Sequence, residues 1–306
     1  MDKSSWRLIH LHRIKGVSRK LIWKMLKKDP YLEELYHLSI TELVLQYQIS
    51  LDKATWIKNE LQNTSLKKEI YRDAQTYTII TIYHQQYPPS LRCIPDPPLV
   101  LYLHGNPSLL KYDPILSVVG TRQPSKYARN VMQKLLIPLA RENWLICSGL
   151  ALGIDGIAHE IAIMEQSPTI AVIGCGLNHI YPKEHVKLFN RISEVGLIVS
   201  EYPPNQSPKR YYFPERNRII SGLSFGTLVI EAKQKSGSLI TVEQALEQGR
   251  EVLAVPGSLM NIASEGCHQL IQDGAKLVYS AVDILNEWES SKERWQMLIS
   301  NDEKIM

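Results

Sequence analysis

The sequence contains few cysteines, and none of them has a metal-binding spacing. The 306 residues include 4 cysteines, Cys93, Cys147, Cys175 and Cys267, without a C-x-x-C pair. A structural zinc site needs about four close nitrogen or sulfur ligands, whereas Cys267 and His268 supply only one adjacent pair. We therefore expect reduced cysteines in a packed core and no metal site.

The sequence also lacks a long apolar run. A membrane helix needs roughly 20 consecutive apolar residues, and no segment approaches that length. Residues 1–7 are charged and contain no apolar signal core, so nothing indicates export. The composition, 44% hydrophobic and 22% charged residues, is typical of a globular protein rather than a disordered one. From these features we expect a cytoplasmic protein.

The charge of the chain has little excess of one sign, with a formal net charge of +4 at pH 7. Residues 1–70 hold 13 Lys and Arg against 8 Asp and Glu, a net charge of +5, and the remainder carries −1. Overall charge therefore gives no argument for nucleic-acid binding by the body of the chain. Such binding would require locally clustered cations.

Two common nucleotide-binding motifs are absent. Gly174-Cys175-Gly176 begins like a dinucleotide fingerprint, but His179 stands where the third glycine is required. No G-x-x-x-x-G-K-[ST] loop occurs in the chain. These absences disfavour an NAD- or ATP-dependent enzyme, and we expect no cofactor.

Residues 1–70 are predicted to form short amphipathic helices. Apolar residues from Leu21 to Leu26 recur at helical spacing after a glycine at position 16, and Ser18 is the expected N-cap between them. Helix, glycine turn and helix form the outline of a sterile-alpha-motif (SAM) or helix-hairpin-helix unit. DNA contact by this unit and an ordinary bundle with solvated lysines are equally open.

In the remainder of the chain, short apolar runs alternate with amphipathic stretches. This alternation predicts a mostly parallel sheet covered by helices on both faces. We predict an α/β fold with an extended Rossmann-like, doubly wound domain at residues 71–290, after the helical domain at residues 1–70. Residues 291–306 are expected to be a short tail without a winged helix. The apolar runs are 115–119, 144–147, 169–173, 197–199, 227–230, 252–255 and 277–279.

Ligands of such folds bind outside the carboxyl ends of the strands, so the residues that follow each run deserve comparison. Gly120 and Arg122 follow the first run, where a structural turn and a phosphate contact are equally open. Asp155 is expected to cap the helix after the second run. Gly237 and Ser238 begin another helix and form a possible phosphate cradle.

The most informative segment is residues 209–218, which interleaves four cationic side chains with three aromatic ones. Cations can follow the backbone of a single DNA strand, and aromatic faces stack on bases at about 1–3 kcal/mol each. The alternative is a surface loop whose arginines pair with Glu201, Glu215 or Glu231.

Taken in order along the chain, these segments resemble the DNA-processing DprA/Smf family over roughly residues 80–285. The resemblance implies a cytosolic protein that binds single-stranded DNA during natural transformation, the uptake of DNA by cells in the state of competence. It also implies that the protein shields incoming strands, loads the recombinase RecA, forms dimers and catalyses no reaction. The matching segments are Gly120–Arg122, Ser148–Asp155, Gly174–Pro182, Ser200–Pro204, Phe213–Ile220, Ser236–Thr241, Gly249–Val252, Val255–Ser258 and Gly266–Ile271.

The resemblance also assigns roles to individual residues. It implies that Leu246, His268 and Leu277 lie near the surface for self-association and RecA contact. Leu152 departs from the family pattern, since many relatives carry a basic residue there, so one phosphate contact is expected to be missing. The expected DNA-binding residues are the cations Arg122, Lys183, Arg210, Arg216 and Arg218, the shaping residues Phe213 and Asn217, and Gly120, Ser148, Gly149, Gly237 and Ser238.

One enzymatic alternative is a nucleotide phosphoribohydrolase of the lysine-decarboxylase-like Rossmann group. Gly222, Gly226-Thr227 and Glu231 only loosely match the Gly-Gly-x-Gly-Thr-x-x-Glu loop of that group. Leu223 breaks the first glycine pair, and the spacing from threonine to glutamate is longer. A third class, a scaffold without a ligand, leaves the cationic and aromatic segment at residues 209–218 unexplained.

Overall fold

The structure, a computed structural model, describes residues 2–300. The chain divides into two compact units. One unit holds residues 2–87 and 98–102, and the other holds residues 88–97 and 103–300. We call them the helical unit and the sheet unit, after the elements that dominate each.

The helical unit is built from short helices joined by polar turns. Ser18 is the N-cap of α2, as predicted, and its Oγ accepts a hydrogen bond from the Leu21 amide at 3.3 Å. Gly16 in the preceding turn has φ +85°, a conformation that glycine adopts readily. The elements are α1 (Lys3–Arg13), α2 (Arg19–Leu26), η1 (Glu34–Tyr36), α3 (Ile40–Tyr47), α4 (Leu51–Gln62), α5 (Thr64–Thr76) and β1 (Thr78–Thr81).

The helical unit extends beyond the predicted boundary at residue 70, because α5 continues to Thr76. This helix packs against α1, and Arg13 Nη1 donates to Asp73 Oδ2 at 2.5 Å. Only 5% and 10% of these two side chains are exposed, so the pair joins the two helices inside the unit. The helix ends at Thr76, where Tyr77 is extended and its amide donates to Asp73 O.

The sheet unit is organised around parallel strands. β3 pairs with β4 on one side and with β7 on the other, in the order β6-β5-β4-β3-β7-β8-β9. The strand order reverses at β3, so the junction of β3 and β7 is a topological switch point. The strands are β3 (Ile115–Val119), β4 (Leu145–Ser148), β5 (Thr169–Ile173), β6 (Leu197–Ser200), β7 (Gly226–Val229), β8 (Glu251–Ala254) and β9 (Lys276–Leu277). Strand β2 (Val100–Gly105) is divided, with residues 100–102 in the helical unit and 103–105 in the sheet unit.

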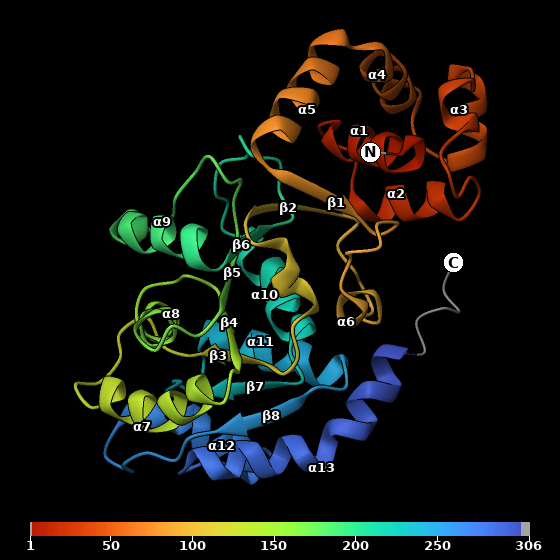
Figure 1. The fold of residues 1–306 in the computed structure, drawn as a ribbon. Coiled ribbons are helices and arrows are strands. Elements are labelled where there is room, and N and C mark those ends of the chain that lie inside the picture. The colour runs from red at the N-terminus through yellow and green to blue at the C-terminus, as the bar shows by residue number, and fades with distance from the viewer. Residues whose placement is uncertain (1, 301–306) are drawn as a thin grey trace. The chain divides into compact units, whose positions relative to one another are not determined.

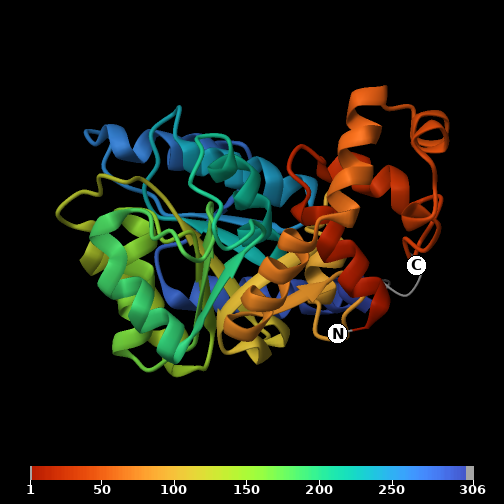
Figure 2. The ribbon, with the colours of Figure 1, turned by 90° about the horizontal axis from the view of Figure 1, so that it is seen from above.

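Helices cover both faces of this sheet (Figures 1 and 2). Leu116 and Val118 of β3 belong to the apolar core with α7 and α8, whereas Ser117 donates to Ile220 O of α10 at 2.7 Å. Successive strand residues point to opposite faces, so these contacts place α7 and α10 on opposite sides. The predicted α/β, doubly wound, mostly parallel Rossmann-like sheet is confirmed. The helices are α6 (Pro89–Arg92), η2 (Pro107–Lys111), α7 (Ala128–Arg141), α8 (Ile154–Met164), η3 (Lys183–His185), α9 (Val186–Val195), α10 (Tyr212–Leu223), α11 (Gly237–Glu247), η4 (Ile262–Ser264), α12 (Glu265–Gln272) and α13 (Ala281–Ser300).

The end of the chain differs from the predicted short tail at residues 291–306. Residues up to Ser300 continue α13, and residues 301–306 lie outside the described part. Trp288 and Trp295 of this helix are buried in the apolar core, and Trp295 Nε1 donates to Asp113 Oδ1 at 3.2 Å. The tryptophans lie seven residues apart on one helix face, so the segment is ordered by packing rather than solvated.

Residues 2–300 contain neither a membrane-spanning helix nor a metal-binding cluster. No helix there combines the length and hydropathy that a membrane crossing requires. In the same part of the chain, no group of three or more His, Cys, Asp or Glu side chains is arranged to hold a metal ion. All four cysteines are free thiols, and Cys147 lies fully buried in β4, where burial raises its pKa to about 12.

Candidate nucleic-acid interface

A cavity of about 620 Å³ opens at the topological switch point of the sheet unit. It lies where β3 and β7 end, between the loop after β3 and the start of α11. This is the position at which open α/β sheets bind their ligands. The predicted DNA-binding residues that line it are Gly120, Arg122, Arg210, Phe213, Arg216, Asn217, Gly237 and Ser238.

Two arginines give this cavity its positive charge. Arg122 in the loop after β3 and Arg210 before α10 are both exposed, and both line the cavity. Neither forms an ion pair with any other residue of the described chain, 2–300. Each guanidinium therefore keeps its donors for a ligand, and its planar fork suits phosphate.

The start of α11 adds backbone donors to the same cavity. Ser236 is the N-cap of this 11-residue helix, and its Oγ accepts from the Ser238 amide at 3.4 Å. Nothing lies within 4 Å of the place where a Cβ on Gly237 would stand, so the backbone there is open to an approaching group. The partial positive charge of a helix N-terminus favours an anion beside the two arginines.

Arg216 lies at the inner wall of the cavity and is 5% exposed. Its guanidinium donates to Gly149 O at 2.5 Å and to Val172 O, which joins the loop after β4 to β5. A Cβ at Gly149 would stand 2.5 Å from Arg216 Nη1, so only glycine permits this approach. Arg216 thus supports the wall of the cavity more than it faces the solvent.

Asp155 balances the charge of Arg216 inside the protein. Burial raises the pKa of this carboxyl group, and the neighbouring Arg216 charge opposes that rise. The sequence predicted that Asp155 caps α8, and this prediction is wrong, because Gly153 occupies the N-cap position. The carboxylate instead accepts from the amides of Gly149 and Ala151, at 3.1 and 3.3 Å. The preceding glycine turn brings these amides within reach.

Four of the predicted DNA-binding residues do not line this cavity: Gly149, whose carbonyl accepts from Arg216, and Arg218, Ser148 and Lys183. Arg218 is 6% exposed, and its Nη2 donates to both carboxylate oxygens of Glu201 at 2.7 and 2.8 Å. Ser148 is fully buried at the end of β4 and donates to Val118 O at 2.6 Å. Lys183 is exposed at the start of η3 but does not line the cavity. For Arg218, the alternative that arginines of the 209–218 segment pair with nearby glutamates is therefore correct.

The structure adds a residue that sequence reasoning did not select. Tyr181 lines the cavity, is 46% exposed, and its ring centroid lies 5.3 Å from that of Phe213. Two aromatic faces therefore meet beside the arginines. Its place in the loop after β5, at the carboxyl edge of the sheet, was the available signal.

The residues expected to mediate self-association lie on three elements of the sheet unit. Leu246 of α11 is 62% exposed and Leu277 of β9 is 40% exposed. His268 of α12 is half-buried, and its Nε2 lies 3.0 Å from Gly257 O. Exposed leucines of this kind are available to a protein partner.

The residue that would serve a hydrolase as a catalytic carboxylate is engaged in structure. Glu231 is 9% exposed and accepts hydrogen bonds from the Ser125 amide at 2.8 Å and the Ser125 hydroxyl at 2.6 Å. It does not line the cavity that holds Arg122 and Arg210. The carboxylate fixes the loop after β3 instead of facing the cavity.

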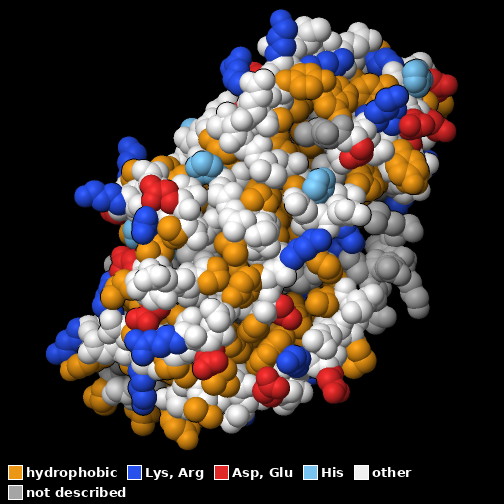
Figure 3. Space-filling view, viewed as in Figure 1, with side chains coloured by type: hydrophobic (Ala, Val, Ile, Leu, Met, Phe, Trp, Pro, Cys, Tyr) orange, Lys and Arg blue, Asp and Glu red, His pale blue; other side chains and the backbone are white. Residues whose placement is uncertain are grey.

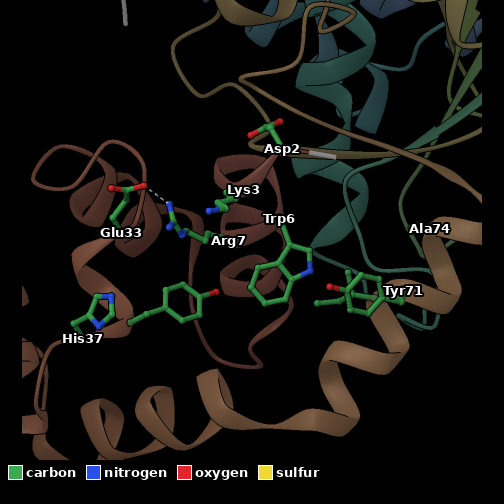
Figure 4. A pocket seen from close by; sticks show the side chains of 10 residues that line it. Asp2, Lys3, Trp6, Arg7, Glu33, His37, Tyr71 and Ala74 are labelled. Carbon is green, nitrogen blue, oxygen red and sulfur yellow. Dashed lines mark hydrogen bonds and ion pairs between the residues drawn. The ribbon is translucent and has the colours of Figure 1, made fainter.

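The helical unit contains a cavity of its own, of about 610 Å³ (Figure 4). Its lining includes Trp6 and Arg7 of α1, Tyr36 of η1 and Tyr71 of α5. Arg7 is paired there, because its Nη1 donates to Glu33 Oε1 at 2.8 Å. This cavity is therefore aromatic, with its arginine already neutralised.

The face seen in Figure 3 has no single basic patch. Lys and Arg side chains are interspersed there with acidic and apolar ones, in agreement with the small net charge of +4. The cavity with Arg122 and Arg210 is such a local cluster of cations.

Comparison with known proteins gives a consistent result. The model of the family DNA recombination-mediator protein A matches residues 78–289. DNA processing protein DprA of Bacillus subtilis (strain 168) is 44% identical over 277 residues, which cover 89% of this chain and 91% of that protein. The solved structure of DNA processing protein A from Streptococcus pneumoniae has a TM-score of 0.83 and 38% identity, covering 92% of this chain and 98% of that one. A structure from Helicobacter pylori, which concerns the unique single-stranded DNA binding mode of its DNA processing protein A, has a TM-score of 0.63 and 30% identity, covering 70% and 97%.

Proposed function

The chain belongs to the DNA recombination-mediator protein A family, and on that premise we propose that it binds single-stranded DNA in the cavity between β3 and β7. The observation that carries this proposal is the pair of exposed, unpaired arginines, Arg122 and Arg210, beside the open start of α11. Arginine forks and backbone amides hold phosphates without reading sequence.

Aromatic side chains in the same cavity suit the bases. Phe213 and Tyr181 meet at its wall, and every base offers a face on which an aromatic ring can stack. In this proposal Arg122 and Arg210 hold phosphates, and Asn217 and Ser238 donate to the strand. Arg216 and Arg218 support the wall from inside, and Lys183 meets the strand outside the cavity.

The wider role we propose is that of a cytoplasmic recombination mediator without an enzymatic reaction. The protein shields incoming single strands and loads RecA onto them during natural transformation, and it acts as a homodimer. The exposed Leu246 and Leu277 support a contact surface for a second copy and for RecA near His268. The buried Glu231, bound by Ser125, argues against the phosphoribohydrolase alternative.

The test is a titration of fluorescent single-stranded oligonucleotides with the full chain over a range of salt concentrations. We expect binding whose logarithm falls linearly with the logarithm of salt, because bound cations displace condensed counterions. Absent or salt-independent binding would refute the proposal. A parallel incubation with nucleoside monophosphates should release no free base, and a robust release would favour the hydrolase.

A further inference from the structure

A second cavity lies at the same edge of the sheet, on the other side of the loop that follows β3. It has a volume of about 470 Å³ and is lined by Lys126 and Tyr127 of that loop, together with Met260 and Asn261 beyond β8. The first cavity is lined by Gly120–Arg122 of the same loop. Both cavities thus open at the carboxyl ends of β3 and its neighbours, within one unit.

The side chains of this second cavity are unusually exposed for apolar groups. Tyr127 is 62% exposed, and Met260 is 93% exposed. The Lys126 ammonium lies 5.0 Å from the centroid of the Tyr127 ring. An exposed aromatic ring with a cation beside it is the combination that single-stranded nucleic acid uses, one group for the base and the other for its phosphate.

A short basic loop connects the two cavities. The loop between β7 and α11 starts at the wall of the second cavity with Glu231 and reaches the first at Ser236. Lys233 and Lys235 lie between these points, and both are exposed. In the part of the chain that the structure describes, neither lysine forms an ion pair.

We propose that a bound DNA strand continues from the first cavity across Lys233 and Lys235 into the second, where a base stacks on Tyr127. The inference rests on the proposed function and extends it by a second subsite. The lysines neutralise the phosphates between the two cavities, and Lys126 neutralises the phosphate next to the stacked base. Glu231 at the wall is 9% exposed and accepts two hydrogen bonds from Ser125, whereas the three lysines along this path are exposed.

The test compares oligodeoxythymidylates of about 4 and about 16 nucleotides, which bracket common site sizes of single-strand binding modules. Tyr127→Ala in the full chain is expected to lower affinity for the long strand roughly tenfold and to leave the short strand unaffected, since one base stack is lost. Tyr127→Phe keeps the ring and should keep the affinity. Tyr31→Ala is the matched control, because Tyr31 is 60% exposed in the helical unit.

Charge reversal tests the path between the cavities. For the long strand, Lys233→Glu with Lys235→Glu should reduce the slope of log affinity against log salt by about 1.4, at about 0.7 per phosphate contact. Lys111→Glu with Lys134→Glu makes the same charge change at exposed positions outside both cavities and should leave a larger slope.

The outcomes separate the two proposals. If the wild-type chain binds the long strand but Tyr127→Ala and the lysine reversal match their controls, the second subsite is refuted and the first cavity stands. If these variants change sedimentation of the free protein instead of DNA affinity, the second cavity is an interface between copies and the subsite is again refuted. If the wild-type chain binds no strand at all, both proposals fail.

Discussion

The two units carry cavities of nearly equal size, about 610 Å³ in the helical unit and about 620 Å³ in the sheet unit. Their chemistry differs. Arg7 in the helical unit is paired with Glu33 at 2.8 Å, whereas Arg122 and Arg210 in the sheet unit form no ion pair within residues 2–300. Volume alone therefore does not indicate a ligand. Charge that the protein leaves unpaired does, because its counterion must come from outside.

The two cavities also differ in what holds their walls. Helix sides carrying Trp6 and Tyr71 enclose the cavity of the helical unit, whereas strand ends and the buried, oppositely charged Arg216 and Asp155 enclose that of the sheet unit. Arg216 and Asp155 fix the loop after β4 from inside, so the exposed arginines stand on a rigid frame. Preorganised donors lose less entropy when a phosphate arrives.

The largest expected effect comes from that frame. Arg216→Ala leaves Asp155 buried without its cation, and we expect the free energy of unfolding to fall by about 3–5 kcal/mol. Urea unfolding of the variant and the wild type measures this loss. The control is Arg191→Ala, since Arg191 is exposed and pairs with Glu194 at the surface, which predicts a change within about 0.5 kcal/mol. Equal losses in both variants would show that the buried Arg216 charge does not stabilise the fold.

The next effect concerns the unpaired charge itself. Arg122→Glu should weaken single-stranded DNA binding roughly 10- to 100-fold at low salt and equally for all base sequences, because a phosphate contact becomes a repulsion. Arg7→Glu, the corresponding change in the helical unit, should leave affinity close to that of the wild type. Fluorescence anisotropy measures both. A larger loss for Arg7→Glu would mean that DNA binds in the cavity of the helical unit rather than in that of the sheet unit.

The sequence predicts most of the sheet unit because its signals are local. Apolar runs at 115–119 and 169–173 coincide with β3 and β5, and Gly237 and Ser238 do begin a helix. Because ligands of open α/β sheets bind at the carboxyl ends of the strands, and these ends share one edge, the predicted strands also locate the cavity. Residues such as Arg122 could therefore be assigned to a site before their neighbours were known.

What the sequence could not predict depends on tertiary packing. Glu201 was among the possible partners of the arginines in this segment, but the sequence could not decide that Arg218 is buried and pairs with it while Arg210 stays exposed. The sequence predicts a tail at residues 291–306 because α13 packs against α7 and α6, which lie far away in the chain. Burial and pairing decide such cases, and periodicity alone reports neither.

A smaller effect is expected from pH on the free energy of unfolding. Each unit contains one buried histidine that contributes to it, His10 in the helical unit and His159 in the sheet unit. Burial lowers the pKa of His10 to about 4 and that of His159 to about 3, from a usual value of 6.5. The unfolded chain therefore binds protons that the folded one rejects, and stability present above pH 6.5 is lost as pH falls toward those values. Each histidine contributes about 1 kcal/mol of loss between pH 6.5 and 5.5.

Substitution of His10 isolates the contribution of the helical unit. His10 Nδ1 lies 2.8 Å from Tyr36 Oη, so His10→Gln keeps a polar group near that hydroxyl while removing the titration. Urea unfolding at pH 7 and pH 5.5 should show an acid loss for the variant that is smaller by about 1 kcal/mol. An unchanged acid loss would mean that the pKa of His10 is the same in the folded and the unfolded chain.

The smallest expected effect is the sharpest test of the comparison between the cavities. Tyr71 is 59% exposed and lines the cavity of the helical unit beside Trp6 (Figure 4). Tyr71→Ala should change the affinity for single-stranded DNA less than about twofold, because the arginine of this cavity is already paired with Glu33. The variant should be measured both alone and together with Arg122→Glu.

The combined variant gives this prediction its force. If DNA uses the sheet cavity, Tyr71→Ala adds nothing to the loss caused by Arg122→Glu, because it removes no contact to the strand. A tenfold loss with Tyr71→Ala alone would instead make the helical unit a stacking site, with Trp6 and Tyr36 as further platforms. DNA would then bind beside Arg7 although Glu33 pairs with it, and exposed aromatic side chains would predict the binding site better than unpaired arginines do.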